Sequence, residues 1–212
     1  MHHEFWHDRW TKQEIGFHEG QVNALLARYF SALALPHQAR VFIPLCGKAV
    51  DIEWIASQDC EVIGVELNES AVEQFFAERN LSPNIKIVGD HVCYSYENIC
   101  LFVGDFFALT PEQLGPIDAV YDRAAMVALP PEIRQRYVRR LPMLTEQCPM
   151  LLVTFVYDQS ALSGPPFSID MQEIEKHYSH HFNIKCLESV VLEDGLKGKV
   201  SANEQIVLLQ SK

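Results

Sequence analysis

Nearly continuous apolar segments alternate with helical patterns along most of this chain of 212 residues, and no other feature constrains its fold as strongly. Apolar runs without polar alternation are typical of strands that are buried on both faces of a parallel sheet. The helical patterns between them supply the long crossover connections that parallel strands require. We therefore expect a doubly wound, mostly parallel α/β sheet. Its first five predicted strands are 40–45, 61–66, 99–103, 117–121 and 150–157.

Two of the predicted helices begin at residues with recognisable capping chemistry. Asn68 can cap a helix over 69–79, because an Asn side chain accepts hydrogen bonds from the free N–H groups of a first helical turn. Pro130 and Pro131 suit the first turn of a basic amphipathic helix over 132–145, where a missing N–H costs nothing. Both helices follow apolar segments, as the crossover pattern requires.

The last part of the chain departs from this alternation. Residues 184–192 and 204–209 have the pattern of strands, but the connection over 193–199 has no room for a helix. An antiparallel hairpin that closes one edge of the sheet is therefore expected. Together with the five earlier strands it makes a sheet of seven.

The length of the chain indicates one domain over 1–212, since about 200 residues suffice for one well-buried core and are few for two. Within it, residues 1–39 form a helical extension that is rich in aromatic side chains. We expect this extension to fold over the sheet as a lid. The α/β core then spans 40–212.

Charge and hydropathy exclude several classes of partner. With 17 Lys+Arg against 28 Asp+Glu, the net charge is −11 with His neutral, which disfavours binding to nucleic acid or to an anionic membrane. No segment approaches the roughly 18 consecutive apolar residues of a membrane span, and the N-terminus has no signal-peptide pattern. We expect a cytoplasmic monomer that acts on a small molecule.

The cysteines and histidines do not have the spacing of a metal site, so no metal is expected. His177, His180 and His181 lie three and four residues apart without an acidic or Cys partner nearby, which favours a polar helix face. The cysteines form no C-x-x-C pair, and this scatter predicts reduced, mostly buried thiols. They are Cys46, Cys60, Cys93, Cys100, Cys148 and Cys186.

In an open α/β sheet, ligands bind beyond the carboxyl ends of the strands, near the point where the strand order reverses. The residues expected there include Gly47, Glu66, Phe106 and Arg123, each following a predicted strand. Glu66 lies about 20 positions after the glycine turn, where a carboxylate can accept hydrogen bonds from ribose hydroxyls. The turn has one glycine rather than the G-x-G-x-x-G run that binds pyrophosphate. S-adenosylmethionine, a nucleoside cofactor without phosphate, is therefore favoured over NAD.

Several motifs resemble those of the thiopurine S-methyltransferase family, most closely its bacterial members. The turn after the first strand is P-L-C-G-K, a distinctive replacement for the usual glycine-rich methyltransferase loop. The resemblance runs nearly end to end and implies a class I, Rossmann-like methyltransferase that uses S-adenosylmethionine. The segments that carry it are 5–10, 16–18, 42–51, 64–66, 121–125 and 164–167.

The resemblance implies that Trp10, Leu45, Glu66 and Arg123 contact the cofactor. Glu66 would hold the ribose hydroxyls, and Leu45 would pack beside the methionine part or the sugar. Trp10 would place an aromatic face over the cationic cofactor. Arg123 would bond the cofactor carboxylate or an anionic acceptor, and the alternative is a structural ion pair with Asp122 or another acid.

The expected reaction is methyl transfer to the sulfur of a thiopurine or of another aromatic or heterocyclic thiol, which leaves S-adenosylhomocysteine (SAH). Selenium or tellurium species are further candidate acceptors. Such thiols ionise near neutral pH, so a general base is optional, and Asp8 and His18 are the weak candidates. Phe17 is expected to line the acceptor pocket. Phe106 is expected near the adenine, with packing in the core as the alternative.

Two other functions fit the same architecture. The first is an NAD-linked oxidoreductase, which the single glycine of the turn disfavours. The second is a non-catalytic protein that keeps the S-adenosylmethionine pocket. Binding and turnover measurements separate these functions from methyl transfer.

Overall fold

The computed structural model describes residues 3–12 and 19–212, and within them one mixed sheet of nine strands forms the centre of the molecule. Parallel pairing joins the five strands that the apolar runs predicted. The strands are β1 (Arg40–Pro44), β2 (Glu61–Glu66), β3 (Asn84–Val88), β4 (His91–Tyr96), β5 (Ile99–Val103), β6 (Ala119–Arg123), β7 (Met150–Tyr157), β8 (Phe182–Val191) and β9 (Ala202–Ser211).

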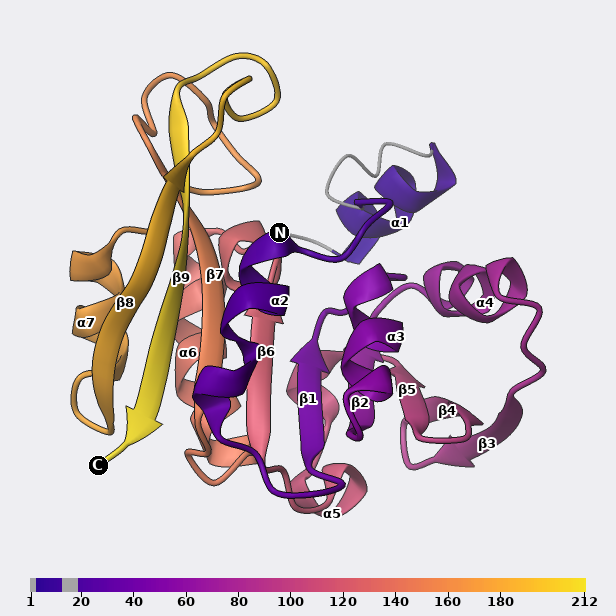
Figure 1. Cartoon of the computed structure of the whole chain (residues 1–212). Helices are drawn as coiled ribbons and strands as arrows, with labels where there is room; N and C mark the ends of the chain where they lie inside the picture. The colour runs from indigo at the N-terminus through magenta and orange to yellow at the C-terminus, as the bar shows by residue number, and fades with distance from the viewer. Residues whose placement is uncertain (1–2, 13–18) are drawn as a thin grey trace.

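The strand order is β3-β4-β5-β2-β1-β6-β7-β9-β8 (Figure 1). The expected C-terminal hairpin is present, since β8 pairs antiparallel with β9, and β9 pairs antiparallel with β7. The expected total of seven strands is wrong, because β3 and β4 add an antiparallel hairpin beside β5. The prediction also placed the fourth parallel strand two residues too early, since β6 extends through Arg123.

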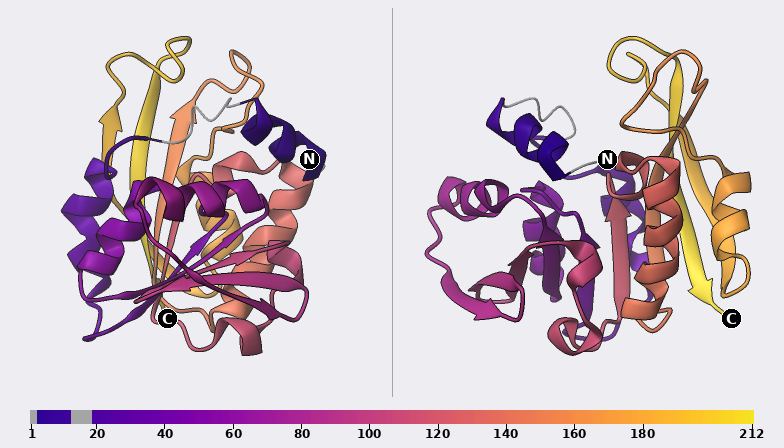
Figure 2. Two further views of the ribbon diagram at one scale, coloured as in Figure 1. Left: turned by 90° about the vertical axis from the view of Figure 1, so that its right-hand side faces the viewer. Right: turned by 180° about the vertical axis from the view of Figure 1, so that it is seen from behind.

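Helices cover both faces of the sheet, as the doubly wound architecture requires (Figures 1 and 2). One apolar layer packs α2, α3 and α4 against one face, and a second packs α6 and α7 against the other. The helices are α1 (His3–Thr11), α2 (Ala24–Tyr29), α3 (Val50–Ser57), α4 (Glu69–Glu78), α5 (Pro111–Leu114), α6 (Pro131–Leu144) and α7 (Met171–Tyr178), with short 3₁₀ turns η1 (Phe30–Leu33), η2 (Phe106–Ala108) and η3 (Met126–Ala128).

The helix starts follow from the capping residues. The Asn68 side chain accepts a hydrogen bond from Ser70 N at 3.0 Å and so caps α4, as the sequence predicted. Pro131 occupies the first turn of α6. The helix α7 ends at Tyr178, so His177 lies in its last turn and His180 and His181 lie beyond it. The expectation that His177 has no acidic partner nearby is wrong, since its Nε2 lies 3.6 Å from Glu173 Oε1 one helical turn earlier.

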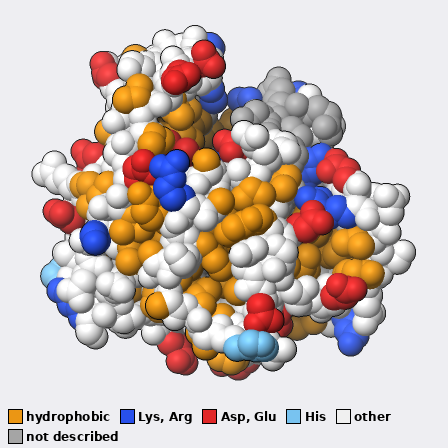
Figure 3. All heavy atoms as spheres, viewed as in Figure 1, with side chains coloured by type: hydrophobic (Ala, Val, Ile, Leu, Met, Phe, Trp, Pro, Cys, Tyr) orange, Lys and Arg blue, Asp and Glu red, His pale blue; other side chains and the backbone are white. Residues whose placement is uncertain are grey.

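Several features of the surface bear on the expected partners. No helix within 3–12 and 19–212 is both long enough and apolar enough to cross a bilayer. Among the side chains coloured in Figure 3, Lys and Arg are scattered over the drawn face rather than gathered in one patch.

All six cysteines are free thiols. In the same ranges, no three His, Cys, Asp or Glu side chains are grouped as metal ligands.

Candidate functional site

The strand order reverses between β1 and β6, so the carboxyl ends of β1, β2 and β6 meet at the expected ligand site. Figure 1 shows α1 above these strand ends, beside the turn that leads from β1 into α3. The residues predicted for the ligand site therefore lie at one edge of the sheet, and the binding of a ligand there stays a prediction.

The turn after β1 is held in one conformation by its backbone and by its neighbours. Leu45 and Gly47 both have positive φ, at 46° and 55°. The Cys46 N–H donates to the Val65 carbonyl at 3.0 Å, which ties the turn to β2. Lys48 is buried, and its Nζ lies 2.5 Å from Glu78 Oε1 on α4. The lysine of the P-L-C-G-K motif therefore anchors the turn to α4.

Glu66 is the buried acid at the end of β2, where the sequence placed it. Its Oε2 accepts from Gly47 N at 2.9 Å, and its Oε1 accepts from Asn68 N at 2.8 Å. Burial raises the pKa of Glu66, although these backbone donors act in the opposite direction. We call Gly47, Glu66 and Asn68 the carboxylate cradle.

The cradle keeps acceptor capacity for a ligand. A carboxylate offers about four lone-pair sites, and the two backbone N–H groups occupy two of them. The backbone of Leu67 is a further donor to this carboxylate, which still leaves acceptor capacity for a ligand. Two adjacent hydroxyls of a ribose are a chemical match for this pair of oxygens.

Trp10 joins α1 to the cradle. Its side chain is buried, and a Cβ added at Gly47 would lie 3.4 Å from Trp10 Cζ2, so the indole packs directly on the glycine. One helical turn earlier, His7 Nδ1 lies 3.1 Å from Asn68 Nδ2. The first helix therefore contacts two of the three cradle residues.

Arg123 lies at the end of β6 with its side chain 9% exposed. Its NH2 pairs closely with Glu19, and its NH1 lies 4.0 Å from Asp51 Oδ2. Its Nε is buried and has no hydrogen-bond partner among the described residues. Burial alone would lower the pKa of Arg123, but the neighbouring acidic groups outweigh it and raise the pKa. A ligand carboxylate would find an unused donor here.

A buried polar network surrounds this arginine. Asp51 accepts from Tyr121 OH at 3.0 Å and from the backbone of Asn23 at 2.9 Å. The Asn23 side chain donates to Glu204 Oε1 at 3.0 Å, and burial raises the pKa of Glu204. The sequence reasoning missed this network. The available signal was acidic residues inside apolar runs, at Asp51 within Val50–Ile52 and at Glu204 in the last strand.

Asp122 lies on the opposite face of the sheet, because successive residues of a strand alternate between faces. Its carboxylate accepts from Tyr137 OH at 2.6 Å and from Met126 N at 3.1 Å. The structural ion pair that we considered for Arg123 is therefore present, but its acids are Glu19 and Asp51 rather than Asp122. Asp122 instead holds the backbone that follows Arg123.

Phe106 is buried in the core layer beneath the end of β5. Its ring centroid lies 5.0 Å from that of Tyr137 and 5.3 Å from that of Phe107. Nearby, His91 donates from Nε2 toward the Asp105 carbonyl at 3.0 Å, while its Nδ1 is buried without a partner in the described structure. The contact between Phe106 and adenine stays a prediction.

The remaining predicted site residues are Asp8, Phe17 and His18 for the acceptor side and Leu45 for the cofactor. Asp8, a weak candidate for a base, is exposed in α1 and forms a surface ion pair with Lys12 at 3.6 Å. Phe17 and His18 lie outside the described residues. Leu45 is half-buried and packs against the core. No other side chain in the described ranges forms a set of nucleophile and base at these strand ends.

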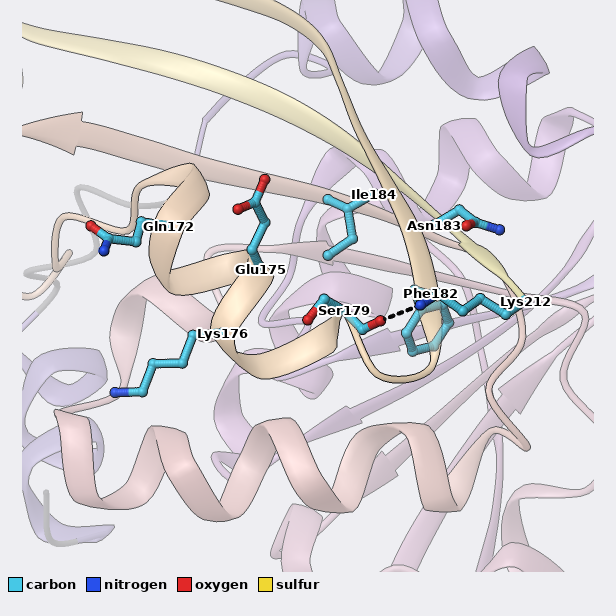
Figure 4. Close-up of a pocket in the computed structure, with 8 residues that line it drawn as sticks. All are labelled: Gln172, Glu175, Lys176, Ser179, Phe182, Asn183, Ile184 and Lys212. Carbon is cyan, nitrogen blue, oxygen red and sulfur yellow. Dashed lines mark hydrogen bonds between the residues drawn. The ribbon is translucent and has the colours of Figure 1, made fainter.

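A separate pocket of about 480 Å³ lies between α7 and the start of β8, with polar and charged side chains around it (Figure 4). Lys212 Nζ donates to the Ser179 carbonyl at 2.7 Å across one end of it. The strands β6, β7 and β9 separate β8 from β1. This pocket is therefore distinct from the site at the strand ends.

Known proteins resemble this chain along its whole length. A family model described as thiopurine S-methyltransferase (TPMT) matches residues 1–212. The chain is 46% identical to a thiopurine S-methyltransferase of Xanthobacter autotrophicus over 211 residues, which cover 99% of both chains. It is 45% identical to a protein of the same description from Pseudomonas fluorescens, over 93% of this chain and 91% of that one.

Solved structures show the same fold at low sequence identity. A SAM-dependent methyltransferase from Anabaena variabilis is similar with a TM-score of 0.64 and 16% identity, over 99% of this chain and 95% of that one. A magnesium protoporphyrin IX methyltransferase from Synechocystis, solved with bound SAH, is similar with a TM-score of 0.63 and 16% identity, over 98% and 95% of the chains. The sheet therefore has the class I methyltransferase architecture, extended by the β3–β4 hairpin.

Proposed function

The chain belongs to the thiopurine S-methyltransferase family, and from this premise we propose how its own residues serve methyl transfer to sulfur. It is an S-adenosylmethionine-dependent thiopurine S-methyltransferase. The residue assignments rest on the carboxylate cradle, in which the N–H groups of Gly47 and Asn68 hold the buried carboxylate of Glu66 in one orientation.

The residues at the strand ends fit S-adenosylmethionine. Glu66 has remaining acceptor capacity for the ribose hydroxyls, and the buried Nε of Arg123 is a donor for the methionine carboxylate. Gly47 has no side chain to obstruct the sugar, and Leu45 is placed to pack beside it. Trp10 supplies an aromatic face near the cradle, where a ring within about 6 Å of a cation contributes roughly 0.5–2 kcal/mol. Phe106 is assigned to the adenine end.

When bound, the cofactor supplies a methyl group that its sulfonium already activates toward nucleophiles. The protein therefore has to hold the acceptor sulfur in line and exclude water, rather than to activate the methyl group itself. The helix α1, seated on the cradle through Trp10, is positioned to close the site from solvent. Phe17 is assigned to the acceptor wall and Arg123 to an anionic acceptor as well.

A thiolate acceptor requires no general base. Thiopurines and aromatic thiols ionise near neutral pH, so a large fraction reaches the site as the nucleophile. Asp8 is exposed and pairs with Lys12 on the surface of the molecule. We assign no catalytic base, and we extend the acceptors to other aromatic or heterocyclic thiols and to selenium or tellurium species.

The two alternatives predict different binding and turnover. An NAD-linked oxidoreductase would need a phosphate-binding turn, and the turn after β1 has one glycine with Trp10 packed on it. A non-catalytic binding protein would bind SAH without methylating any thiol. We further propose that the protein acts as a cytoplasmic monomer on small molecules, without a resident metal and without a nucleic-acid or membrane partner.

The direct test is a turnover assay with methyl-labelled S-adenosylmethionine across thiopurines, aromatic thiols and selenium acceptors. We expect label to appear on the sulfur of at least one thiopurine, in amounts that rise with enzyme concentration. Binding of SAH without turnover of any acceptor would support the non-catalytic alternative. Binding of NADH without binding of SAH would contradict the methyltransferase assignment.

A further inference from the structure

The helix α1 contacts the same two residues that hold the Glu66 carboxylate. Gly47 donates its N–H to Glu66 Oε2 and has Trp10 packed against its Cα. Asn68 donates its N–H to Glu66 Oε1, and its side chain faces His7. Gly47 and Asn68 can contact the same helix because Trp10 and His7, which are three residues apart, lie on one face of α1.

The direction of the hydrogen bond between His7 and Asn68 follows from the other partners of Asn68. Its Oδ1 accepts from Ser70 N at 3.0 Å and from Ser70 Oγ at 2.6 Å, so the oxygen faces α4. The amide nitrogen Nδ2 must then face His7, and it can only donate. His7 therefore accepts through Nδ1, which places the ring proton on Nε2.

This bond gives His7 a specific role. We propose that His7 is a positioning residue that docks α1 onto Asn68, so that lid docking and ribose binding at Glu66 stabilise each other. The inference rests on the proposed function, since it takes the ribose of S-adenosylmethionine as the ligand of Glu66. His7 acts through Asn68 and does not touch the reacting atoms.

The geometry separates this role from that of a general base. The lone pair of His7 at Nδ1 already accepts from Asn68, and Nε2 carries the proton. The neutral ring in this state has no free lone pair with which to take a proton from an acceptor. A docking role needs only the bond that is present.

The test uses three substitutions of His7 in the full chain. In His7→Asn the side-chain oxygen can take the place of Nδ1, whereas in His7→Gln it reaches the position of Nε2, and His7→Ala removes both. Lys12→Ala is the matched control, because Lys12 directly follows the same helix and its side chain is 62% exposed in a surface ion pair with Asp8 of α1. Circular dichroism checks that each variant is folded.

Two readouts are measured for each protein. Calorimetric titration gives the affinity for SAH, and hydrogen exchange of peptides that cover residues 3–12 reports the docking of α1 when SAH binds. We expect His7→Ala and His7→Gln to bind SAH about fivefold more weakly, which corresponds to one neutral hydrogen bond, and to lose the protection of α1. His7→Asn and Lys12→Ala should retain both properties.

The outcomes also separate this inference from the proposed function. If the wild-type protein binds SAH and methylates a thiol, but His7→Ala matches it in affinity and in α1 protection, the docking role is wrong while the function stands. The docking role is equally wrong if His7→Asn is as impaired as His7→Ala. If the wild-type protein does not bind SAH, both proposals fail.

Discussion

Glu66 is a single residue on which two separate parts of the backbone depend. Its two oxygens fix the turn at Gly47 and the start of α4 at Asn68, and we propose that its remaining acceptor capacity serves the ligand. The same carboxylate thus serves the local structure and the ligand. On the other face of the sheet, the Asp122 carboxylate accepts a hydrogen bond from Met126 N and so holds the backbone that follows Arg123.

The buried Asp122 predicts a pH dependence of stability. Burial raises the pKa of Asp122 from its ordinary value of 3.8 to about 6, although its hydrogen bonds act in the opposite direction. The native state therefore binds the proton more tightly than the unfolded state, so this contribution to stability is complete at low pH and is lost as the pH rises through about 6. Near neutral pH the ionised Asp122 carboxylate therefore lowers the free energy of unfolding relative to its protonated form.

We expect the free energy of unfolding of the wild type to fall by about 1 kcal/mol relative to Asp122→Asn between about pH 5 and about pH 7.5. Urea unfolding of both proteins at the two pH values measures this difference. Asp90→Asn is the control, because Asp90 is exposed in the turn between β3 and β4. A difference between the wild type and Asp122→Asn that stays constant with pH would contradict the assignment.

Among the elements, those with continuous apolar runs could be predicted from the sequence and the others could not. The bounds of β2, β5 and β7 agree with the predicted strands residue for residue. Both faces of these strands pack in the core, so the continuous apolar run in the sequence is enough to locate each strand. The hairpin of β3 and β4 was missed, since Ile85 and Ile87 are exposed and alternate with polar residues. Its Gly89-Asp90 turn was the available signal.

The site was predictable where one residue type at one position suffices. Glu66 lies at the predicted strand end, where burial of a carboxylate is costly unless hydrogen-bond donors pair with it. The network around Arg123 was not predictable, since Glu19, Asp51 and Glu204 come from three distant parts of the chain and meet only in the folded sheet. Asp122 and Arg123 lie inside β6 rather than after it, so the alternation of side chains along a strand puts them on opposite faces of the sheet.

The packing of the turn on β2 predicts that Gly64 cannot be replaced. A Cβ at this position would lie 2.7 Å from Cys46 Sγ and 2.7 Å from Leu101 Cδ2. We expect Gly64→Ala to lower the free energy of unfolding by about 1–3 kcal/mol, as overpacking of a buried contact does. Chemical denaturation measures the change.

Gly20→Ala is the matched control for this substitution, because a Cβ at Gly20 would meet no atom within 4 Å. We expect its stability to equal that of the wild type within about 0.5 kcal/mol. Equal stabilities for Gly64→Ala and Gly20→Ala would mean that Cys46 does not pack on β2 as described. The turn would then lack one of its two anchors.

At the scale of the whole molecule, we propose that the sheet is the platform of the site and that α1 covers it. The core layers on the two faces involve all parallel strands. The helix α1 contacts the turn after β1 through Trp10 and the start of α4 through His7. The division into a lid over 1–39 and a core over 40–212 remains a proposal.

Removal of residues 1–17 tests this division. We expect the truncated protein to keep a cooperative thermal transition, since the core layers lie in the rest of the chain. Its affinity for SAH should fall by about tenfold or more, because both Trp10 and His7 are lost. Thermal unfolding and calorimetric titration measure the two properties, and an unchanged affinity with unchanged methyl transfer would show that the segment is no lid.

The central claim is that Glu66 binds the ribose of the methyl donor at the carboxyl end of β2. Calorimetric titration of SAH into Glu66→Gln tests it most directly, with Glu61→Gln as the control at the opposite end of the same strand. We predict that Glu66→Gln weakens binding by about tenfold to a hundredfold, as loss of hydrogen bonds to a charged acceptor does, while Glu61→Gln binds as the wild type. Equal affinity of Glu66→Gln and Glu61→Gln for SAH would contradict the claim.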